Sequence, residues 1–184
     1  MRATPRCDAC RHHADSALAM MRIAVIHATP VRESIHALKY RNRPELADIL
    51  ARYLVATVMR APWRDLYLTT DGVVPVPLHE KRRQERGYNQ SELLASAFCR
   101  QSQLPLRSEW LMRRRATQSQ VGLSATERQQ NVASAFVADH TVRGKRLILF
   151  DDVYTTGATI DACARALHTA GAAAVYGLAL ACPR

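Results

Sequence analysis

LILFDDVYTTGAT, from Leu147 to Thr159, is the most informative segment of the 184-residue sequence. Its first four residues are apolar, as is typical of a strand buried on both faces of a parallel sheet. Two aspartates, Asp151 and Asp152, follow at once, and then a loop that contains Gly157. After the loop, apolar residues recur at helical spacing up to about Gly171. The segment therefore predicts a strand, a tight loop and a helix.

The composition of this loop suits a sugar phosphate. The N-terminus of a helix carries unpaired N–H groups and a partial positive charge, and both attract phosphate. Gly157 allows the backbone to close around an anion. Asp151 and Asp152 can accept hydrogen bonds from vicinal ribose hydroxyls. Further donors are the hydroxyls of Thr155, Thr156 and Thr159. A ligand with a sugar diol next to a phosphate satisfies both halves of the loop.

Two widespread phosphate-binding motifs do not occur in the sequence. It contains neither Gly-x-x-x-x-Gly-Lys-Ser/Thr nor Gly-x-Gly-x-x-Gly. The alternative interpretation is an ordinary strand, turn and helix with a polar loop. Two acids, three threonines and a glycine at one strand end are unusual for such a turn, so phosphate binding is favoured.

The rest of the chain alternates strands with helices. This pattern predicts an α/β fold with a mostly parallel sheet flanked by helices. Pro75 and Pro77 cannot donate hydrogen bonds within a sheet, so the strand expected at Val73–Leu78 should lie at an edge. A polar loop is expected at 79–89. Helices are expected at 31–60, after Asn89, from Ser124 to about Ala133 and from Ile160, and strands at Leu66–Leu68, Trp110–Arg115, Phe136–Val137 and Val175–Ala181.

The segment 147–159 closely resembles the signature of type I phosphoribosyltransferases, which bind phosphoribosyl pyrophosphate. The resemblance implies a fold like that of this class. It also implies that Asp151 and Asp152 contact the ribose hydroxyls and that the loop holds the 5-phosphate. The loop residues carried over by position are Thr155, Thr156, Gly157, Ala158 and Thr159.

A phosphoribosyl pyrophosphate site also needs donors for the pyrophosphate at the end of another strand. VPVPLHEKRRQERGYNQ, at 74–90, provides them. His79, Lys81 and Arg82 are expected to bind the diphosphate, with Mg²⁺ offsetting its charge. The arginines of this segment should ease the departure of pyrophosphate electrostatically. The alternative is a solvated basic loop that caps a helix. The expected catalytic residues are Asp151, Asp152, Arg82 and Arg86.

The order and spacing of several motifs extend the resemblance to the ComF family. That family is associated with natural competence and DNA uptake and includes GntX-type relatives. Besides the loop, the resemblance is carried by Arg86-Gly87-Tyr88-Asn89-Gln90 and by LKYRNRPELADIL at Leu38–Leu50. It covers roughly residues 31–182. The resemblance to type I phosphoribosyltransferases also implies a mobile hood over the active site at 113–131. Further matches are Leu111 to Arg113, Thr117, Gln120, Arg128, Asn131 and Phe136.

Two functions from different classes are expected. As a phosphoribosyltransferase, the protein binds phosphoribosyl pyrophosphate with Mg²⁺, transfers ribose 5-phosphate to an acceptor that the sequence does not identify, and releases pyrophosphate. As a non-catalytic competence or DNA-uptake protein, it binds single-stranded DNA. The formal net charge of +10 suits either polyanion. Nearly all of the 26 basic residues are arginine, which suits bidentate phosphate binding; codon bias is the other explanation.

Residues 1–30 are expected to form an N-terminal appendage, and residues 31–184 a phosphoribosyltransferase-like domain. Cys7-x-x-Cys10 resembles half of the zinc ribbon with which ComF-like proteins usually open. Cys7 and Cys10 are therefore candidate zinc ligands. A structural zinc site needs four ligands, so the alternative is a pair of unliganded thiols.

The sequence also bears on compartment and assembly. No stretch approaches the ~20 apolar residues that a membrane span needs. Arg2, Arg6, Asp8 and Arg11 break up any apolar core of the signal-peptide kind. We therefore expect a cytoplasmic protein. The oligomeric state is not settled by the sequence, and a homodimer is among the states that it allows.

Overall fold

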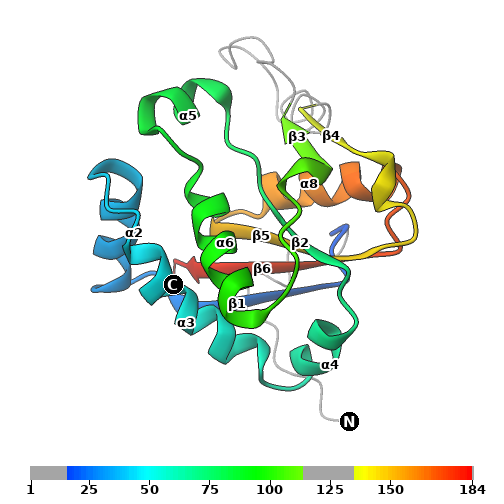
Figure 1. Ribbon diagram of the computed structural model, residues 1–184, viewed down its shortest axis with the longest axis horizontal. Helices are drawn as coiled ribbons and strands as arrows, with labels where there is room; N and C mark the ends of the chain where they lie inside the picture. Colours follow the sequence, from blue (N-terminus) through cyan, green and yellow to red (C-terminus); the bar gives the residue numbers. More distant parts are fainter. Residues whose placement is uncertain (1–15, 114–134, 184) are drawn as a thin grey trace.

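A parallel four-stranded sheet forms the centre of the protein (Figure 1). The computed structural model describes residues 16–113 and 135–183. Each neighbouring pair of strands in this sheet is parallel. The strands lie in the order β1 (Met20–Ile26), β6 (Ala174–Cys182), β5 (Arg146–Val153) and β2 (Gly72–Pro75). The predicted α/β fold with a mostly parallel sheet flanked by helices is therefore confirmed.

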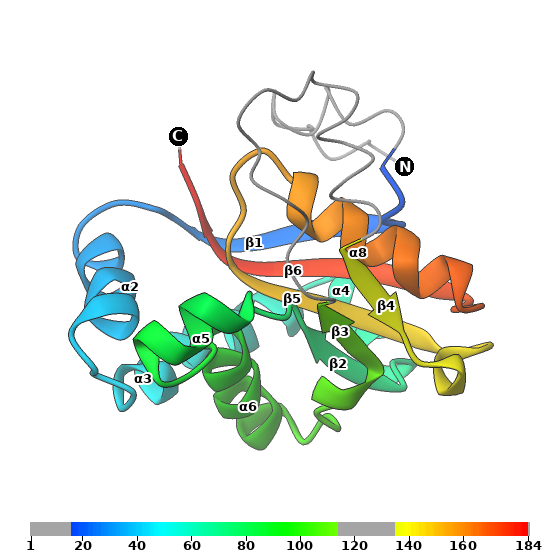
Figure 2. The ribbon, with the colours of Figure 1, turned by 90° about the horizontal axis from the view of Figure 1, so that it is seen from above.

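Helices cover both faces of the sheet. One face is packed by α2 (Val31–Tyr40), α3 (Leu46–Val58), α4 (Trp63–Leu68) and α6 (Gln90–Ser102). The other is packed by α8 (Ala158–Thr169) and by an antiparallel pair, β3 (Leu111–Arg113) and β4 (Phe136–Ala138). Figure 2 shows α8 on the opposite side of the sheet from α3 and α6. Two short 3₁₀ helices, η1 (Ser108–Trp110) and η2 (His140–Val142), flank this pair.

The predicted central strand is β5. Leu147 to Phe150 are fully buried, because β5 has a strand on each side and helices over both faces. Phe150 stacks on Phe98 of α6, with ring centroids 6.5 Å apart. The next residue, Asp151, pairs with Ala179 of β6. The two aspartates thus emerge from the middle of the sheet, at its carboxyl edge.

Strand β2 lies at the edge of the sheet, as its prolines predict. On its inner side it pairs with β5 from Gly72 to Pro75. On its outer side, among the described residues, Val73 is bonded to residues 105 and 107 through N–H···O bonds of 2.9 and 2.8 Å. Pro75 has no N–H, so it cannot donate a further hydrogen bond on this outer side.

Two segments form helices where the sequence predicts other structure. Leu66–Leu68, expected as a strand, belong to α4, because Trp63 in its first turn is fully buried in the core. The expected polar loop at 79–89 contains α5 (Glu80–Arg86), which no buried residue anchors. His79 caps its N-terminus by accepting from the Lys81 N–H at 3.2 Å, and Gly87, at φ 77°, ends it.

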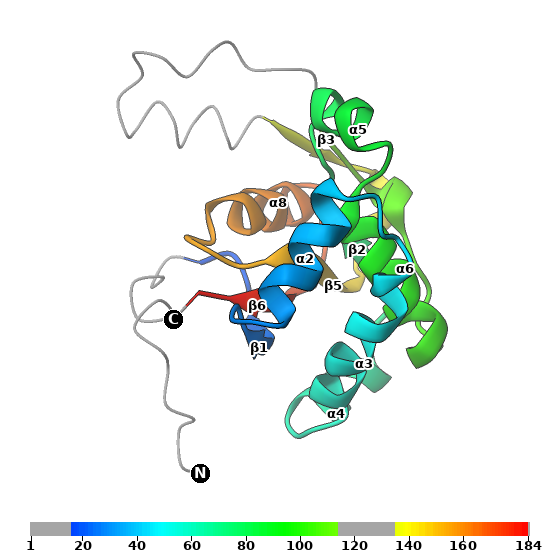
Figure 3. The ribbon, with the colours of Figure 1, turned by 90° about the vertical axis from the view of Figure 1, so that its left-hand side faces the viewer.

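The helix expected at 31–60 is divided into α2 and α3. Asn42 has a left-handed φ of 47°, a conformation that ends a helix and that asparagine tolerates better than most residues. Pro44 then lies just before the start of α3. The break turns α2 away from α3, so that α2 lies at the end of the sheet to which β5 and β6 run (Figures 1 and 3).

Strand β1 lies within the segment expected to be an appendage. It pairs in parallel with β6, from Met20 opposite Tyr176 to Ile26 opposite Cys182. A boundary after residue 30 therefore does not separate the sheet from what precedes it. Residues 1–15, with Cys7 and Cys10, and the helix expected from Ser124 lie outside the described residues. In the described part of the chain, no helix has the length and apolar character to span a membrane.

Candidate functional site

An acidic pair stands at the carboxyl end of β5. Asp152 is buried and Asp151 is half-buried. Ser91, in the first turn of α6, donates from its Oγ to Asp151 Oδ1 at 2.8 Å, and the Asp152 N–H donates to the same oxygen at 2.9 Å. These two bonds fix the Asp151 carboxyl at the strand end.

Asp152 is held by groups from two other elements. Lys39, at the end of α2, forms an ion pair with Asp152 Oδ2. Gln90, the first residue of α6, donates from Nε2 to Asp152 Oδ1 at 3.4 Å. The Lys39 side chain is 20% exposed and that of Asp152 is 6% exposed. The pair is thus largely withdrawn from water, where removing one partner is costly.

The two carboxyls differ in their electrostatics. Burial and then the neighbouring charge of Asp152 raise the pKa of Asp151 to about 7, against the lowering effect of the Ser91 hydrogen bond, the Asp152 N–H and Lys39. Asp151 therefore titrates near neutral pH, while Asp152 has a lysine as its counter-ion. A raised carboxyl pKa at the end of a strand is a frequent mark of a functional site.

The loop after the acidic pair leads directly into α8. Gly157 is the N-cap of α8, at φ 79°, and no side chain caps the helix there. The Thr156 Oγ1 comes only within 3.5 Å of the Ala158 N–H. Thr155, Thr156, Ala158 and Thr159 are all exposed. An exposed helix N-terminus with donor side chains is a place where a phosphate can bind.

Basic side chains of α5 and β3 lie near one another. All residues of α5 remain at least partly exposed, including Lys81 and Arg82. Arg113 of β3 lies with its guanidinium 5.4 Å from the centroid of the Phe136 ring. Burial lowers the pKa of Arg113, and the charge of Arg82 lowers it further. The two positive charges therefore repel each other, and an anion bound near both would be stabilised.

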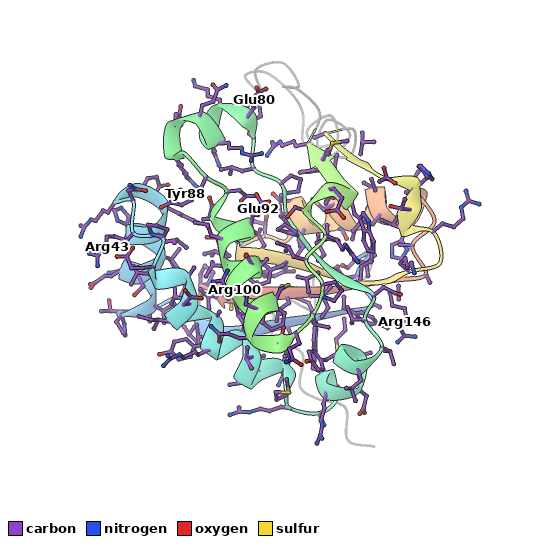
Figure 4. The ribbon with its side chains drawn as sticks, viewed as in Figure 1. Arg43, Glu80, Tyr88, Glu92, Arg100 and Arg146 are labelled. Carbon is purple, nitrogen blue, oxygen red and sulfur yellow. The ribbon has the colours of Figure 1, made fainter. Side chains whose placement is uncertain are left out.

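A pocket of about 430 Å³ lies between α2 and α5. Tyr88 lies between the two helices (Figure 4), and its hydroxyl donates to the Leu38 carbonyl. Arg86 donates to Gln90 Oε1 at 2.8 Å and to the Tyr40 hydroxyl at 3.2 Å, and its guanidinium lies 4.9 Å from the centroid of the Tyr40 ring. The pocket is lined by Lys39, Tyr40, Asn42, Arg82, Glu85, Arg86 and Tyr88.

The structure thus brings the predicted acids and loop together on one segment, from β5 to α8. It puts Arg82 and Arg86 on α5, where they line the pocket. It gives His79 the local task of capping α5, which does not test its predicted contact with pyrophosphate. Thr117, Gln120 and Arg128 lie outside the described residues.

Three residues that contact the acidic pair are not among the site residues predicted from the sequence. Lys39, Gln90 and Ser91 all contact the acidic pair. Gln90 and Ser91 could have been found, because Asn89 caps α6, accepting from the Ser91 N–H at 3.1 Å, and a helix N-terminus places its first residues together. For Lys39 the available signal is its place in the motif at Leu38–Leu50.

The parallel sheet with helices on both faces is an α/β fold of the type I phosphoribosyltransferase-like class. It carries an acidic pair and an open helix N-terminus at the end of a central strand. No model of a known protein family matches the chain. It is, however, 39% identical over 149 residues to "DNA utilization protein YhgH" of Escherichia coli, and 34% identical over 157 residues to "Competence protein F" of Haemophilus influenzae. It is 31% identical over 144 residues to "Competence protein ComFC" of Bacillus subtilis.

These matches cover most of this chain but less of its relatives. The aligned residues are 81%, 83% and 78% of this chain for the three proteins in turn, and 66%, 69% and 56% of the relatives. The chain therefore spans just under two thirds of the length of the Escherichia coli relative. The chain belongs to the ComF family.

Proposed function

We propose that this protein binds phosphoribosyl pyrophosphate with Mg²⁺ and transfers its ribose 5-phosphate to an acceptor. The observation that carries the proposal is that the acidic pair at the end of β5, the loop and the open N-terminus of α8 follow one another directly. Ligands of open α/β sheets bind at the carboxyl ends of the strands. A diol beside a phosphate suits carboxylates that are followed by the N–H groups of a helix N-terminus.

In this proposal the 5-phosphate binds at Thr155 to Thr159, and the ribose diol donates to Asp151 and Asp152. The bond between ribose C1 and the pyrophosphate oxygen breaks, and its electron pair leaves with pyrophosphate. A bond forms between C1 and the acceptor, which loses a proton to solvent. The protein holds the reacting groups in place and stabilises the leaving group electrostatically.

The pyrophosphate would lie toward the start of α5, near Lys81 and Arg82. Among the described residues, no three His, Cys, Asp or Glu side chains gather as a metal site. The two carboxylates of the acidic pair suit Mg²⁺, because this ion keeps several waters and is bound through one or two carboxylates plus substrate phosphates. Asp151 and Asp152 would be the protein's contribution, and the ion would neutralise charge on the departing diphosphate.

The proposal is tested by incubating the protein with phosphoribosyl pyrophosphate, Mg²⁺ and a panel of nucleobases and other amines, and measuring pyrophosphate. We expect release that depends on both Mg²⁺ and an acceptor. Calorimetric titration in parallel reports binding without turnover. Absence of both binding and release would refute the proposal.

The phosphate end of the site gives a separate prediction. Thr159→Glu puts a negative charge at the N-terminus of α8, which favours the helix but repels phosphate. We expect phosphoribosyl pyrophosphate to bind at least about tenfold more weakly, the loss of one charge-assisted hydrogen bond or more. Ala56→Glu, the same charge change at an exposed position of α3, is the control. In a sulfate-soaked crystal, an empty loop beside another filled site would count against this placement.

A role in handling DNA is the second candidate, because relatives carry the names "DNA utilization protein" and "Competence protein". The net charge of +10 also favours it. We predict weak, sequence-independent binding of single-stranded DNA, centred on Arg82, Arg83 and Arg113, and on Arg114 and Arg115 outside the described residues. Log affinity should fall linearly with log salt, with a slope of ~0.7 per phosphate neutralised.

Filter binding at low salt measures this affinity. Displacement of DNA by phosphoribosyl pyrophosphate with Mg²⁺ would place both ligands on the same arginines, and simultaneous binding would place DNA on another face. No retention of DNA at low salt would eliminate this role. The zinc site at Cys7 and Cys10 and the homodimer remain predictions, which metal analysis and sedimentation of the full chain would test.

A further inference from the structure

Arg86 is a cation that neutral groups hold in place. Among the described residues it forms no ion pair, and its hydrogen bonds go to neutral groups, the Gln90 side chain and the Tyr40 hydroxyl. The Tyr40 ring supports the guanidinium on one side and contacts the His36 ring, with centroids 4.9 Å apart. A guanidinium has five N–H donors, so donors remain for a ligand.

The pocket beside Arg86 carries a net positive charge. Its lining contains three cations, Lys39, Arg82 and Arg86, and one carboxylate, Glu85. Lys39 is engaged by Asp152, whereas in the described part of the chain Arg82 has no ion pair. An arginine held in place and facing a polar pocket is suited to a carboxylate or phosphate, which it can bind in bidentate fashion.

The pocket adjoins the acidic pair through two links. Lys39 lines the pocket and pairs with Asp152. Gln90 accepts from Arg86 and donates to Asp152. A molecule in the pocket would therefore lie beside the place proposed for the ribose. A volume of about 430 Å³ lies in the usual range of small-molecule sites.

We propose that this pocket binds a small acidic molecule through Arg86, and that in the proposed transfer this molecule is the acceptor. The inference rests on the proposed function for the acceptor role but not for the binding of an acid. It gives two arginines of α5 different roles: Arg82 serves the pyrophosphate, and Arg86 serves the acidic group of the acceptor. We take this acceptor to be a nitrogen nucleophile that carries a carboxylate, a group that the planar guanidinium can bind in bidentate fashion.

Matched ring compounds test this assignment. Orotate is uracil with an added carboxylate, and nicotinate carries a carboxylate where nicotinamide carries a neutral amide. The ring shape is the same within each pair. We expect each acid to bind the full chain at least about tenfold more tightly than its neutral partner, the worth of a charge-assisted hydrogen bond. Arg86→Gln should remove this preference, and Arg86→Lys should keep part of it. Arg52→Gln, at an exposed position of α3 away from the pocket, should keep all of it.

Binding of phosphoribosyl pyrophosphate with Mg²⁺ is measured on the same variants. Retention within about threefold in Arg86→Gln, with loss of the preference for acids, supports the inference and shows that the variant is folded. No preference for acids in the wild type, with phosphoribosyl pyrophosphate still bound, overturns the inference alone. A larger loss for phosphoribosyl pyrophosphate than for the acids returns Arg86 to the pyrophosphate and also overturns it. Acids that bind at Arg86 without any binding of phosphoribosyl pyrophosphate overturn the acceptor role together with the proposed function.

Discussion

Replacing Asp151 with asparagine should make the protein more stable above pH 7 while weakening its binding of phosphoribosyl pyrophosphate. Burial and the charge of Asp152 raise the pKa of Asp151 from 3.8 to about 7 in the folded protein. Between these values the folded state holds a proton that the unfolded chain has lost. The stability contributed by Asp151 is therefore complete below pH 4 and is lost as the pH rises through 7.

Asparagine at position 151 does not titrate, and its amide oxygen can still accept from Ser91 and from the Asp152 N–H. We expect the free energy of unfolding at pH 8 to rise by on the order of 2–4 kcal/mol. The gain should shrink as the pH falls toward 4. Urea unfolding at pH 8 and pH 5 measures it. Asp48→Asn, at an exposed site on α3, should change the free energy of unfolding by less than about 1 kcal/mol and equally at both pH values.

The same substitution removes a charged acceptor for the ribose diol. Phosphoribosyl pyrophosphate should then bind at least about tenfold more weakly at pH 8, while inorganic phosphate, which does not reach the acids, should bind as before. Equal losses for both ligands would refute the ribose assignment. A variant that is more stable but binds less well is expected where a charge is held in a buried site for function.

The second large effect is expected from Lys39→Met. This change keeps the length of the side chain but leaves the Asp152 carboxyl, 6% exposed, without its counter-ion. Removing one partner of a buried ion pair costs about 3–5 kcal/mol. Because Lys39 is one fifth exposed, we expect a loss of about 3 kcal/mol in the free energy of unfolding at pH 7.

A double variant and a surface pair make this prediction specific. Lys39→Met with Asp152→Asn should recover much of the loss, because the charge that Lys39 neutralised is then removed as well. Lys145→Met breaks the pair with Asp71, whose side chains are 43% and 34% exposed. It should cost about 1 kcal/mol or less. Equal losses for the two lysines would show that the Lys39–Asp152 pair is no more protected than a surface pair.

The short helices show what local pattern leaves undecided. Residues 80–86 contain good helix formers, but α5 buries no residue, so no apolar period marks it. The signals that could have found it are the cap at His79 and the left-handed Gly87, both local. In α4 the decisive residue is Trp63, whose full burial against the core outweighs the strand propensity of Leu66–Leu68.

Local patterns along the chain predict the strand, loop and helix of Leu147–Thr159, the edge position of β2 and the start of α6 after Asn89. Each depends on neighbours along the chain: an apolar run, prolines without N–H groups, and a side chain that reaches a nearby N–H. Only the tertiary structure decided that β1 joins the sheet and that Lys39 meets Asp152. It also placed Arg86 in a pocket with Tyr40. These contacts join residues far apart in the sequence. Those of Lys39 and Arg86 depend on how α2 and α5 pack at the end of the sheet, which no local pattern encodes.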